Sequence, residues 1–318
     1  MPPIVSTDTE TVPGPLIEAV PNFSEGRRPD VIAQVTAAFT TASPDVALLD
    51  SSSDPDHNRT VLTLAGPAEG LLDAVVSGAR SCMELIDLTA HSGVHPRIGS
   101  LDVVPFVPLG GVPLAICADL ARAAGRRLAG ELGLPVFLYG AAAVRPGHVA
   151  LPAVRGRGFE ALAEASADSA RRPDLGGPGP HPTAGATAVG ARPFLIAYNV
   201  DLVSQDLDLV RRIAAAVRER DGGLPAVRAI GLRLPERGRV QVSMNLLDFT
   251  VTPPAVAFDA VARLAAAAGV EVAGSELIGL VPEAALDGLD ADLRAAVDAD
   301  DRIIERRLAA ALGRAQGA

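Results

Sequence analysis

The sequence predicts an α/β (α+β) protein made of two ferredoxin-like α/β subdomains, with mixed sheets and with helices on their outer faces. Three observations carry this expectation. Short apolar strand patterns alternate with apolar patterns of helical period. The order β-α-β-β-α-β, which is typical of the ferredoxin-like arrangement, occurs once in each half. Prolines and glycines interleave in residues 171–186 and separate the two halves.

In the first half, each element follows from a local pattern. A short apolar run predicts a strand over residues 16–20, and Pro29 suits the first turn of a helix over 29–40. Alternating or buried apolar runs predict strands over 46–50, 59–65, 102–107 and 135–139. Helical periodicity predicts helices over 66–85 and 112–132. This half therefore has the order β-α-β-β-α-β, followed by α-β.

The second half repeats the order. The patterns predict strands over 193–200, 226–232, 239–246 and 270–273, and helices over 204–219 and 254–268. A last amphipathic helix is expected over 292–313. We therefore divide the chain into a disordered tail (1–15), an N-terminal subdomain (16–178), a C-terminal subdomain (179–290) and a C-terminal helix (291–318).

Composition excludes several classes of function. The net charge of −10 argues against nucleic acid as a partner, although clustered arginines can still hold a small anion. All 28 basic residues are arginine, so Schiff-base catalysis by lysine and a P-loop lysine are excluded. The two cysteines, Cys82 and Cys117, lie in apolar helical patterns and are expected to be inert buried thiols. The first residues have no secretory signal pattern and no membrane span is evident, so we expect a soluble, cytoplasmic protein with no membrane partner.

One stretch, residues 91–102, concentrates the groups that can do chemistry. It holds His91 and His95, followed by Arg97 and Asp102. Four-residue spacing suits two metal ligands on one helical face, but glycine and proline between and after the histidines favour a loop leading into a strand. Zinc also lacks a third ligand at a recognisable spacing, so we predict no metal.

His95 is the candidate general acid and base, because imidazole both accepts and donates protons near neutral pH. A histidine with only a structural hydrogen bond is the competing interpretation. Asp102 either orients an imidazole or caps the loop where the strand begins. His91 and Arg97 are then supporting residues of the same loop.

Two further positions combine a guanidinium group with a junction between loop and strand. Arg59, preceded by Asn58, and Arg192 suit bidentate recognition of a carboxylate, and a solvated charge is the equal alternative. The preceding loop residues Asp54, Asp56 and His57 are expected to solvate their loop.

Long ordered motifs across residues 16–290 give the chain a family resemblance. They include Val20-Pro-Asn-Phe-Ser-Glu-Gly26, His91-x-Gly-x-His95-Pro-Arg97-x-Gly99-x-x-Asp102 and Gly185-Ala-Thr-Ala-x-Gly-Ala-Arg192. Together they resemble the glutamate formimidoyltransferase family. The resemblance implies transfer of a formimidoyl group from N-formimidoyl-L-glutamate to tetrahydrofolate, a late step of histidine degradation. It also implies a homodimer, with a folate groove between the two subdomains of each chain.

The resemblance also implies roles for individual residues. The catalytic histidine of the family falls on His95, with His91, Arg97 and Asp102 in support and with tetrahydrofolate as co-substrate. Substrate binding falls on Asn22, Asn58, Arg59 and Arg192. The folate-binding residues are Gly176, Gly177, Pro178, Gly179, Pro180, His181, Pro182, Thr183, Ala184, Gly185, Gly222, Gly223 and Leu224.

The sequence departs from the family pattern at two positions. Val94 stands where the family usually has glutamate, and Ser52 stands where it usually has a second aspartate. Losing acidic neighbours makes an imidazole less basic. Two alternatives therefore stay open: a divergent folate-dependent formyl or formimidoyl transferase acting on another amine, and a folate-binding relative without catalytic activity.

Overall fold

The structure, a computed structural model, describes residues 16–315; the tail expected at 1–15 lies outside the described residues. The chain divides into two units, the first ending at Pro193 and the second beginning at Phe194. This division comes later than the predicted boundary at 178/179. The reason is β7, Thr187–Ala191, which pairs in parallel with two strands of the first unit and so belongs to its sheet.

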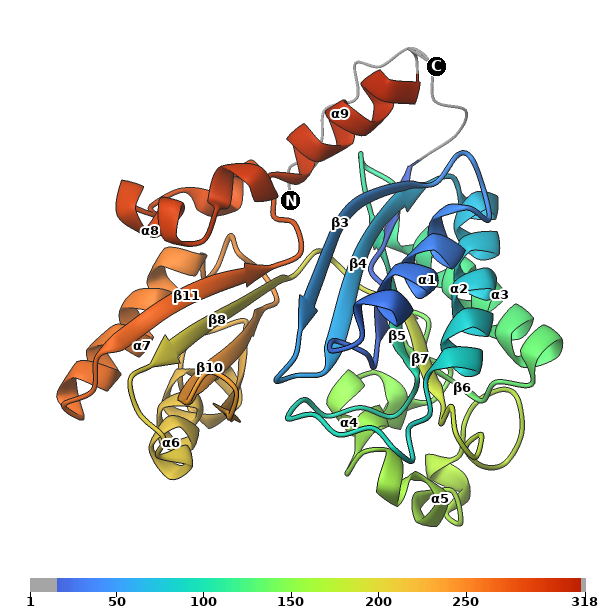
Figure 1. Cartoon of the computed structure of the whole chain (residues 1–318), viewed down its shortest axis with the longest axis horizontal. Helices are drawn as coiled ribbons and strands as arrows, with labels where there is room; N and C mark the ends of the chain where they lie inside the picture. Colours follow the sequence, from blue (N-terminus) through green and yellow to red (C-terminus); the bar gives the residue numbers. More distant parts are fainter. Residues whose placement is uncertain (1–15, 316–318) are drawn as a thin grey trace. The chain divides into compact units, whose positions relative to one another are not determined.

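The first unit is built on a seven-stranded sheet (Figure 1). Its strands are β1 (Ile17–Ala19), β2 (Asn22–Phe23), β3 (Ala47–Asp54), β4 (Arg59–Gly66), β5 (Leu101–Pro108), β6 (Val136–Gly140) and β7. Both β1 and β2 pair with β4 on one side and β5 on the other, so they form one interrupted central strand. The spatial order is therefore β3, β4, β1/β2, β5, β7, β6, and the predicted β-α-β-β-α-β order is confirmed.

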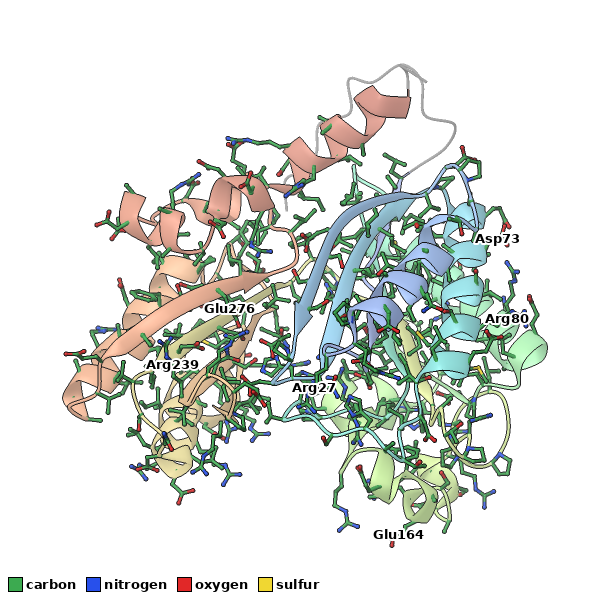
Figure 2. All side chains as sticks on the ribbon, in the orientation of Figure 1. Arg27, Asp73, Arg80, Glu164, Arg239 and Glu276 are labelled. Atoms are coloured by element: carbon green, nitrogen blue, oxygen red, sulfur yellow. The ribbon has the colours of Figure 1, made fainter. Side chains whose placement is uncertain are left out.

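Three helices cover one face of this sheet: α1 (Pro29–Thr40), α2 (Ala68–Leu85) and α3 (Leu114–Leu132). The apolar stripe of α1 ends in Phe39, whose ring packs directly on α2. A Cβ at Gly78 of α2 would lie 2.3 Å from that ring, so only glycine lets the two helices approach this closely. Charged side chains such as Asp73 and Arg80 point away from the sheet on α2 (Figure 2).

A chain of short helical turns lies on the opposite face of the same sheet. The turns are η1 (Pro146–His148), α4 (Leu151–Arg155), η2 (Phe159–Ala161), α5 (Leu162–Ala165) and η3 (Ser169–Arg171). Val154 and Leu162 pack with Phe137 and Tyr139 of β6 in a small second core. The segment therefore covers β6 and β7, and the polar face of β3, β4 and β1/β2 stays outside this small core.

The second unit is a four-stranded antiparallel sheet with the order β11, β8, β10, β9. Its elements are β8 (Ile196–Leu202), α6 (Leu207–Val217), η4 (Glu219–Asp221), β9 (Val227–Leu234), β10 (Arg239–Leu246), α7 (Pro254–Ala267) and β11 (Val272–Ile278). Asp206 caps α6 by accepting hydrogen bonds from two backbone amides of its first turn. The predicted β-α-β-β-α-β order is confirmed here too.

The prediction of one terminal helix over 292–313 is wrong. The chain instead forms η5 (Glu283–Leu286), α8 (Ala291–Ala296), η6 (Ala299–Arg302) and α9 (Ile304–Ala315). Asp298 adopts a left-handed φ of 50°, which ends the helical run. Ile303 then pairs with Val281 in an isolated parallel bridge and is fully buried. Burying this residue favours an extended backbone over a continued helix.

Two composition-based expectations can be compared with the structure. Cys82 and Cys117 are both free and buried, and burial raises the pKa of both thiols, to about 11 for Cys117. They are therefore poor nucleophiles, as expected. Among the helices of residues 16–315, none is both long and apolar enough to cross a bilayer.

Candidate active site

The predicted loop that carries His91 and His95 lies in the connection over residues 86–100, which we call the histidine loop. Asn58 holds it against the β3–β4 hairpin. The Asn58 side chain donates to the carbonyl of Ser92 at 2.9 Å and accepts from the amide of Gly26 at 2.9 Å. Asn58 has a φ of 48°, which asparagine tolerates better than most residues. A Cβ at Gly93 would lie 2.4 Å from the carbonyl oxygen of His57, so glycine is required at this close contact.

His91 supports the loop. Its Nε2 lies 2.9 Å from the carbonyl oxygen of Asn58, and its Nδ1 accepts a 2.7 Å hydrogen bond from Nε of Arg97. Arg97 also donates to the His91 carbonyl and pairs with Glu160 at 2.8 Å. Both ring nitrogens of His91 are thus engaged by the protein, which fits a positioning role.

His95 lies at the centre of the site, and its contacts define a tautomer. Its Nδ1 is 2.8 Å from the carbonyl oxygen of Pro96, which can only accept, so Nδ1 carries the proton. Nη1 of Arg59 lies closer to Nε2, at 2.5 Å, than to Nδ1, at 2.9 Å, and a guanidinium can only donate. Nε2 therefore presents its lone pair, which is the form that a general base needs.

The surroundings keep this imidazole neutral. The pKa of His95 is well below its usual value because the site is desolvated and because the positive charges of Arg59 and Arg155 disfavour a second one. The ring of His57 is tilted against it, with centroids 5.8 Å apart. At neutral pH, His95 is ready to accept a proton.

Arg59 is the first residue of β4, and its guanidinium makes contacts only with neutral partners. It donates to the side-chain oxygen of Asn22 as well as to His95, and its Nε has no hydrogen-bond partner. Within residues 16–315, no ion pair joins it to a carboxylate, and the charge of Asp102 offsets only part of the unfavourable surroundings. Burial and the nearby charge of Arg155 lower the pKa of Arg59 to about 9. A cation in this situation favours an incoming anion.

Asp102 caps the loop where the strand begins, which is the second of its two predicted roles. Its Oδ1 accepts a 2.8 Å hydrogen bond from the amide of Ile98 and so caps the loop at the start of β5, while its Oδ2 pairs with Arg155 at 2.5 Å. No hydrogen bond joins it to His95 in the described part of the chain. Arg155 was not predicted. The only hint in the sequence is that Arg155 and Arg157 alternate with glycines, a turn signal rather than a catalytic one.

Arg192 lies away from the histidines, directly after β7. It hydrogen-bonds to the hydroxyl of Tyr139 and lies near Glu18 of β1. Glu18 is buried, and desolvation raises the pKa of its carboxyl to about 7 despite that arginine. The structure therefore groups Arg192 with Tyr139 and Glu18, and separately groups Asn22, Asn58 and Arg59 with His95.

The glycine-rich stretch over 176–185 ends beside the histidine loop. The amide of Ser100 donates to the carbonyl of Ala184 at 2.9 Å, and the amide of Ala184 donates to Nδ1 of His181 at 3.0 Å. Gly185 has a φ of 70°, and a Cβ there would lie 2.1 Å from the carbonyl oxygen of Ile98. The glycine at position 185 is thus required by the backbone conformation and by the close contact with the histidine loop. The other predicted folate residues belong to the second unit, at the carboxyl end of α6: Gly222, Gly223 and Leu224.

The two departures from the family pattern lie on the hairpin and in the histidine loop. Ser52 donates to the carboxylate of Asp50 at 3.0 Å, and the amide of Val94 donates to the carbonyl of Asp56 at 3.1 Å. The expectation that Asp54, Asp56 and His57 solvate their loop is wrong, because all three are buried. Asp54 and Asp56 therefore lie buried in the hairpin that precedes Arg59.

No group of three or more histidine, cysteine or carboxylate side chains that could hold a metal ion occurs within residues 16–315. Around His95, the side chains provide an imidazole beside the guanidinium of Arg59.

Comparison with known proteins identifies the family. The pattern of the formiminotransferase domain, N-terminal subdomain, matches residues 16–192, and that of the formiminotransferase domain matches residues 197–294. The chain belongs to the formiminotransferase family. It is 43% identical over 273 residues to glutamate formimidoyltransferase of Thermoplasma acidophilum, covering 85% of this chain and 89% of the relative.

Other formiminotransferase relatives include a bifunctional class. The chain is 41% identical over 271 residues to glutamate formimidoyltransferase of Streptococcus pyogenes, covering 90% of that protein. It is 44% identical over 277 residues to formimidoyltransferase-cyclodeaminase of Sus scrofa, but covers only 51% of that relative. The chain thus spans about half the length of the cyclodeaminase-containing proteins and most of the length of the others.

Proposed function

We propose that the protein transfers a formimidoyl group from N-formimidoyl-L-glutamate to tetrahydrofolate, giving 5-formimidoyltetrahydrofolate and L-glutamate. The observation that carries the mechanism is the neutral His95, whose unprotonated Nε2 faces the guanidinium of Arg59. The family supplies the donor and the acceptor, because relatives at 41–43% identity are named for this transfer. The protein is accordingly a transferase of one-carbon groups.

The reaction needs one proton carrier that works in both directions. The folate nitrogen attacks the formimidoyl carbon, and Nε2 of His95 takes the proton that this nitrogen loses. The protonated imidazole then returns a proton to the glutamate nitrogen, so that the carbon–nitrogen bond to glutamate breaks and the tetrahedral intermediate collapses. Positioned proton transfer of this kind contributes about 10²–10⁴-fold.

Arg59 makes the base conditional on substrate. In the absence of ligand, its Nη1 occupies the lone pair of Nε2. A substrate carboxylate offers this guanidinium a charged partner in place of two neutral ones, which releases Nε2 for the incoming nitrogen. Pairing also cancels part of the charge that holds down the pKa of His95, so the base becomes stronger when the donor is bound.

A second function is favoured by one specific observation. Two positions that are usually acidic in the family are neutral here, as Val94 and Ser52. The buried carboxylates of the hairpin are those of Asp54 and Asp56. A site altered in this way suits a folate-dependent formyl or formimidoyl transferase that acts on another amine. A folate-binding relative without activity is the third hypothesis, and the retention of His95 beside Arg59 argues against it.

The decisive experiment mixes the protein with tetrahydrofolate and N-formimidoyl-L-glutamate and follows released L-glutamate and formimidoylated folate by mass spectrometry. We expect turnover by the wild type and at least a hundredfold loss with His95→Ala. If the wild type forms no product from this donor but turns over another formimidoyl or formyl amine, the second function replaces the first. Folate binding without turnover of any donor supports the third.

As part of the same proposal, the protein is a cytoplasmic homodimer that acts late in histidine degradation, with the residues at 176–185 and 222–224 binding folate. These statements rest on the family resemblance. Light scattering of the purified protein tests the dimer, and a folate-dependent decrease in amide exchange at both stretches tests the folate contacts.

A further inference from the structure

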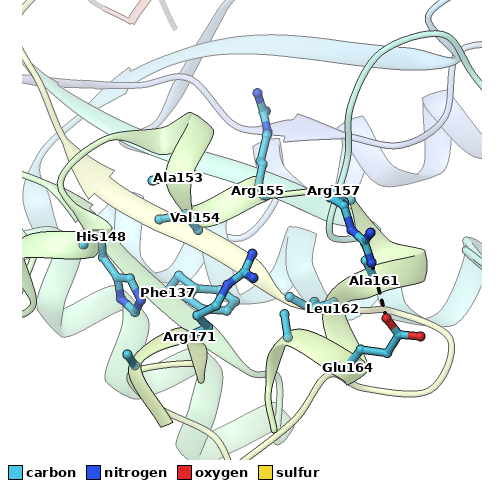
Figure 3. A pocket seen from close by; sticks show the side chains of 15 residues that line it. Phe137, His148, Ala153, Val154, Arg155, Arg157, Ala161, Leu162, Glu164 and Arg171 are labelled. Carbon is cyan, nitrogen blue, oxygen red and sulfur yellow. Dashed lines mark hydrogen bonds and ion pairs between the residues drawn. The ribbon is translucent and has the colours of Figure 1, made fainter. Parts of the chain in front are cut away.

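A cavity of about 530 Å³ lies on the first unit, between β6 and the short turns of residues 146–171 (Figure 3). This volume is within the range of small-molecule sites. Its apolar wall is formed by Phe137, Val154 and Leu162, all buried. His148 stiffens the wall, because its ring packs edge-on against Phe137 and its Nδ1 bonds to Asp174 at 2.9 Å. None of these groups takes part in the chemistry described above.

Three arginines surround this apolar wall: Arg155, Arg157 and Arg171. Arg171 reaches the turn that carries the other two, since a Cβ at Gly156 would lie 3.0 Å from Nη2 of Arg171. Gly156 has a φ of 53°, and the missing side chain leaves room for that guanidinium. Such a concentration of positive charge stands out in a chain whose net charge is −10.

The carboxylates nearby do not neutralise these arginines. Arg155 pairs with Asp102, but its Nε is buried without a hydrogen-bond partner. Arg157 meets Glu164 at 3.3 Å, with both side chains almost fully exposed, and such surface pairs contribute little. Arg171 has no ion pair within residues 16–315. Two exposed guanidinium groups are therefore available to bind an anion, and Figure 3 shows both of them beside the apolar wall.

We propose that this cavity binds a glutamyl dicarboxylate, with its two carboxylates on Arg157 and Arg171 and its methylene groups on the apolar wall. Guanidinium groups recognise carboxylates through paired hydrogen bonds, and two arginines with an apolar surface match two carboxylates joined by a short aliphatic chain. The inference rests on the proposed function. There the donor already places a carboxylate on Arg59, so the glutamyl group with two carboxylates left for the cavity is that of the folate.

The cavity is also connected to the reacting site through a single ion pair. Arg155 lines the cavity, and the carboxylate that it holds, Asp102, caps the histidine loop. A glutamyl group bound here is thus anchored one side chain away from the loop that carries His95. Binding of this kind positions a substrate, so its loss should appear in KM and leave kcat nearly unchanged.

The test uses the full chain with Arg171→Gln and Arg157→Gln, and Arg126→Gln as a matched control on the exposed side of α3. We expect KM for one substrate to rise about tenfold for each cavity variant, the cost of one charge-assisted contact, with kcat and the control unchanged. A rise in KM for N-formimidoyl-L-glutamate alone overturns the assignment to folate and also contradicts the contact of Arg59 with a donor carboxylate. A rise for tetrahydrofolate alone assigns it to the glutamyl end of the folate.

A binding measurement separates this inference from the proposed function. Calorimetric titration of L-glutamate into Arg59→Gln protein should still give binding that is weakened about tenfold by adding Arg171→Gln, whether or not the enzyme turns over. L-glutamine, which lacks the second charge, should bind more weakly than L-glutamate. Equal affinities in the presence and absence of Arg171, together with unchanged KM values, overturn the proposal.

Discussion

The two units share a β-α-β-β-α-β core and differ within it in one connection. In each, the fourth strand of the β-α-β-β-α-β order lies beside the first, and the third lies between the first and the second. In the second unit, the chain from the second helix to the fourth strand is the short turn of residues 268–271. In the first unit, the same connection is the histidine loop, residues 86–100, which carries His91 and His95.

The turns of the β3–β4 and β9–β10 hairpins also differ between the two units. Both end with a left-handed residue before an arginine: Asn58 and Arg59 in the first unit, Gly238 and Arg239 in the second. Gly238 supplies the backbone angle and nothing else. Asn58 supplies the angle and two side-chain hydrogen bonds to other segments, and Arg59 turns toward His95 while Arg239 is exposed. The scaffold is thus shared, and the chemistry comes from what is added to its turns.

The largest expected effect comes from removing the base. His95→Ala should lower kcat by about 10²–10⁴-fold, because no other imidazole has a free lone pair at this position. Formation of 5-formimidoyltetrahydrofolate measures the loss, and the affinity for tetrahydrofolate measured by calorimetry should change little. A variant that keeps more than a tenth of the wild-type kcat would contradict the assigned role.

Next comes the ion pair that caps the loop. Asp102→Asn removes the only carboxylate partner of a largely buried guanidinium, that of Arg155, and should lower the free energy of unfolding by about 3 kcal/mol. Urea unfolding followed by circular dichroism measures this change. An unfolding free energy equal to that of the wild type would mean that the pair does not stabilise the first unit.

Arg59→Gln should have an intermediate effect that depends on pH. Losing a charge-assisted contact to the donor should lower kcat/KM by about 10- to 100-fold. The same change removes a positive charge that depresses the pKa of His95, so the imidazole should take up its proton at a higher pH. Because only the unprotonated form is active, the acid limb of the kcat/KM profile should move up toward pH 6.5.

The corresponding arginine of the second unit provides the control for that profile. Arg239 occupies the place in its hairpin that Arg59 has in the other, but it is exposed. In the Arg239→Gln variant, kcat/KM and the acid limb of its pH profile should therefore equal those of the wild type. An equal shift with both variants would show that the effect arises from net charge and not from contact with His95.

The smallest expected effect tests the polar network on the second sheet. There Asp201 accepts from Gln241 at 2.9 Å and lies 3.4 Å from Arg237, and desolvation raises the pKa of Asp201. Because burial already penalises its charged form, Asp201→Asn should change the free energy of unfolding by about 1 kcal/mol or less. A loss of unfolding free energy as large as that for Asp102→Asn would show that the two polar networks stabilise their units equally.

Much of the fold was predictable from the sequence, because most elements have a strong periodic pattern. The strand over 239–246 and the helix over 29–40 match the structure at both ends. The strand β7 was not predicted, since Thr187–Ala191 consists of small residues with weak strand preference and becomes a strand only between β5 and β6. The break at Asp298 was missed for a similar reason: the burial of Ile303 that imposes it is a tertiary effect.

The site was predictable where its residues are close in sequence and unpredictable where they are distant. The histidine loop and the assignment of His91 as support could be inferred from spacing and from the glycine and proline beside them. Arg155 reaches Asp102 across more than fifty residues, and nothing local indicates the pair. The burial of Asp56 was also missed, because polar loop residues are usually solvated, whereas the carbonyl of this one bonds to the amide of Val94 in the distant histidine loop.

The contacts of Asn58 have a consequence for how the protein becomes active. The β3–β4 hairpin is local and can pair early, whereas the contacts from Asn58 to Gly26 and Ser92 need three distant stretches to meet. Refolding should therefore restore circular dichroism before turnover. In mild urea the order should reverse, with catalysis failing while the sheet persists, because a loop held by a few polar contacts opens at lower cost than a buried strand. Catalysis should therefore persist over a narrower range of urea concentration than the folded sheet does.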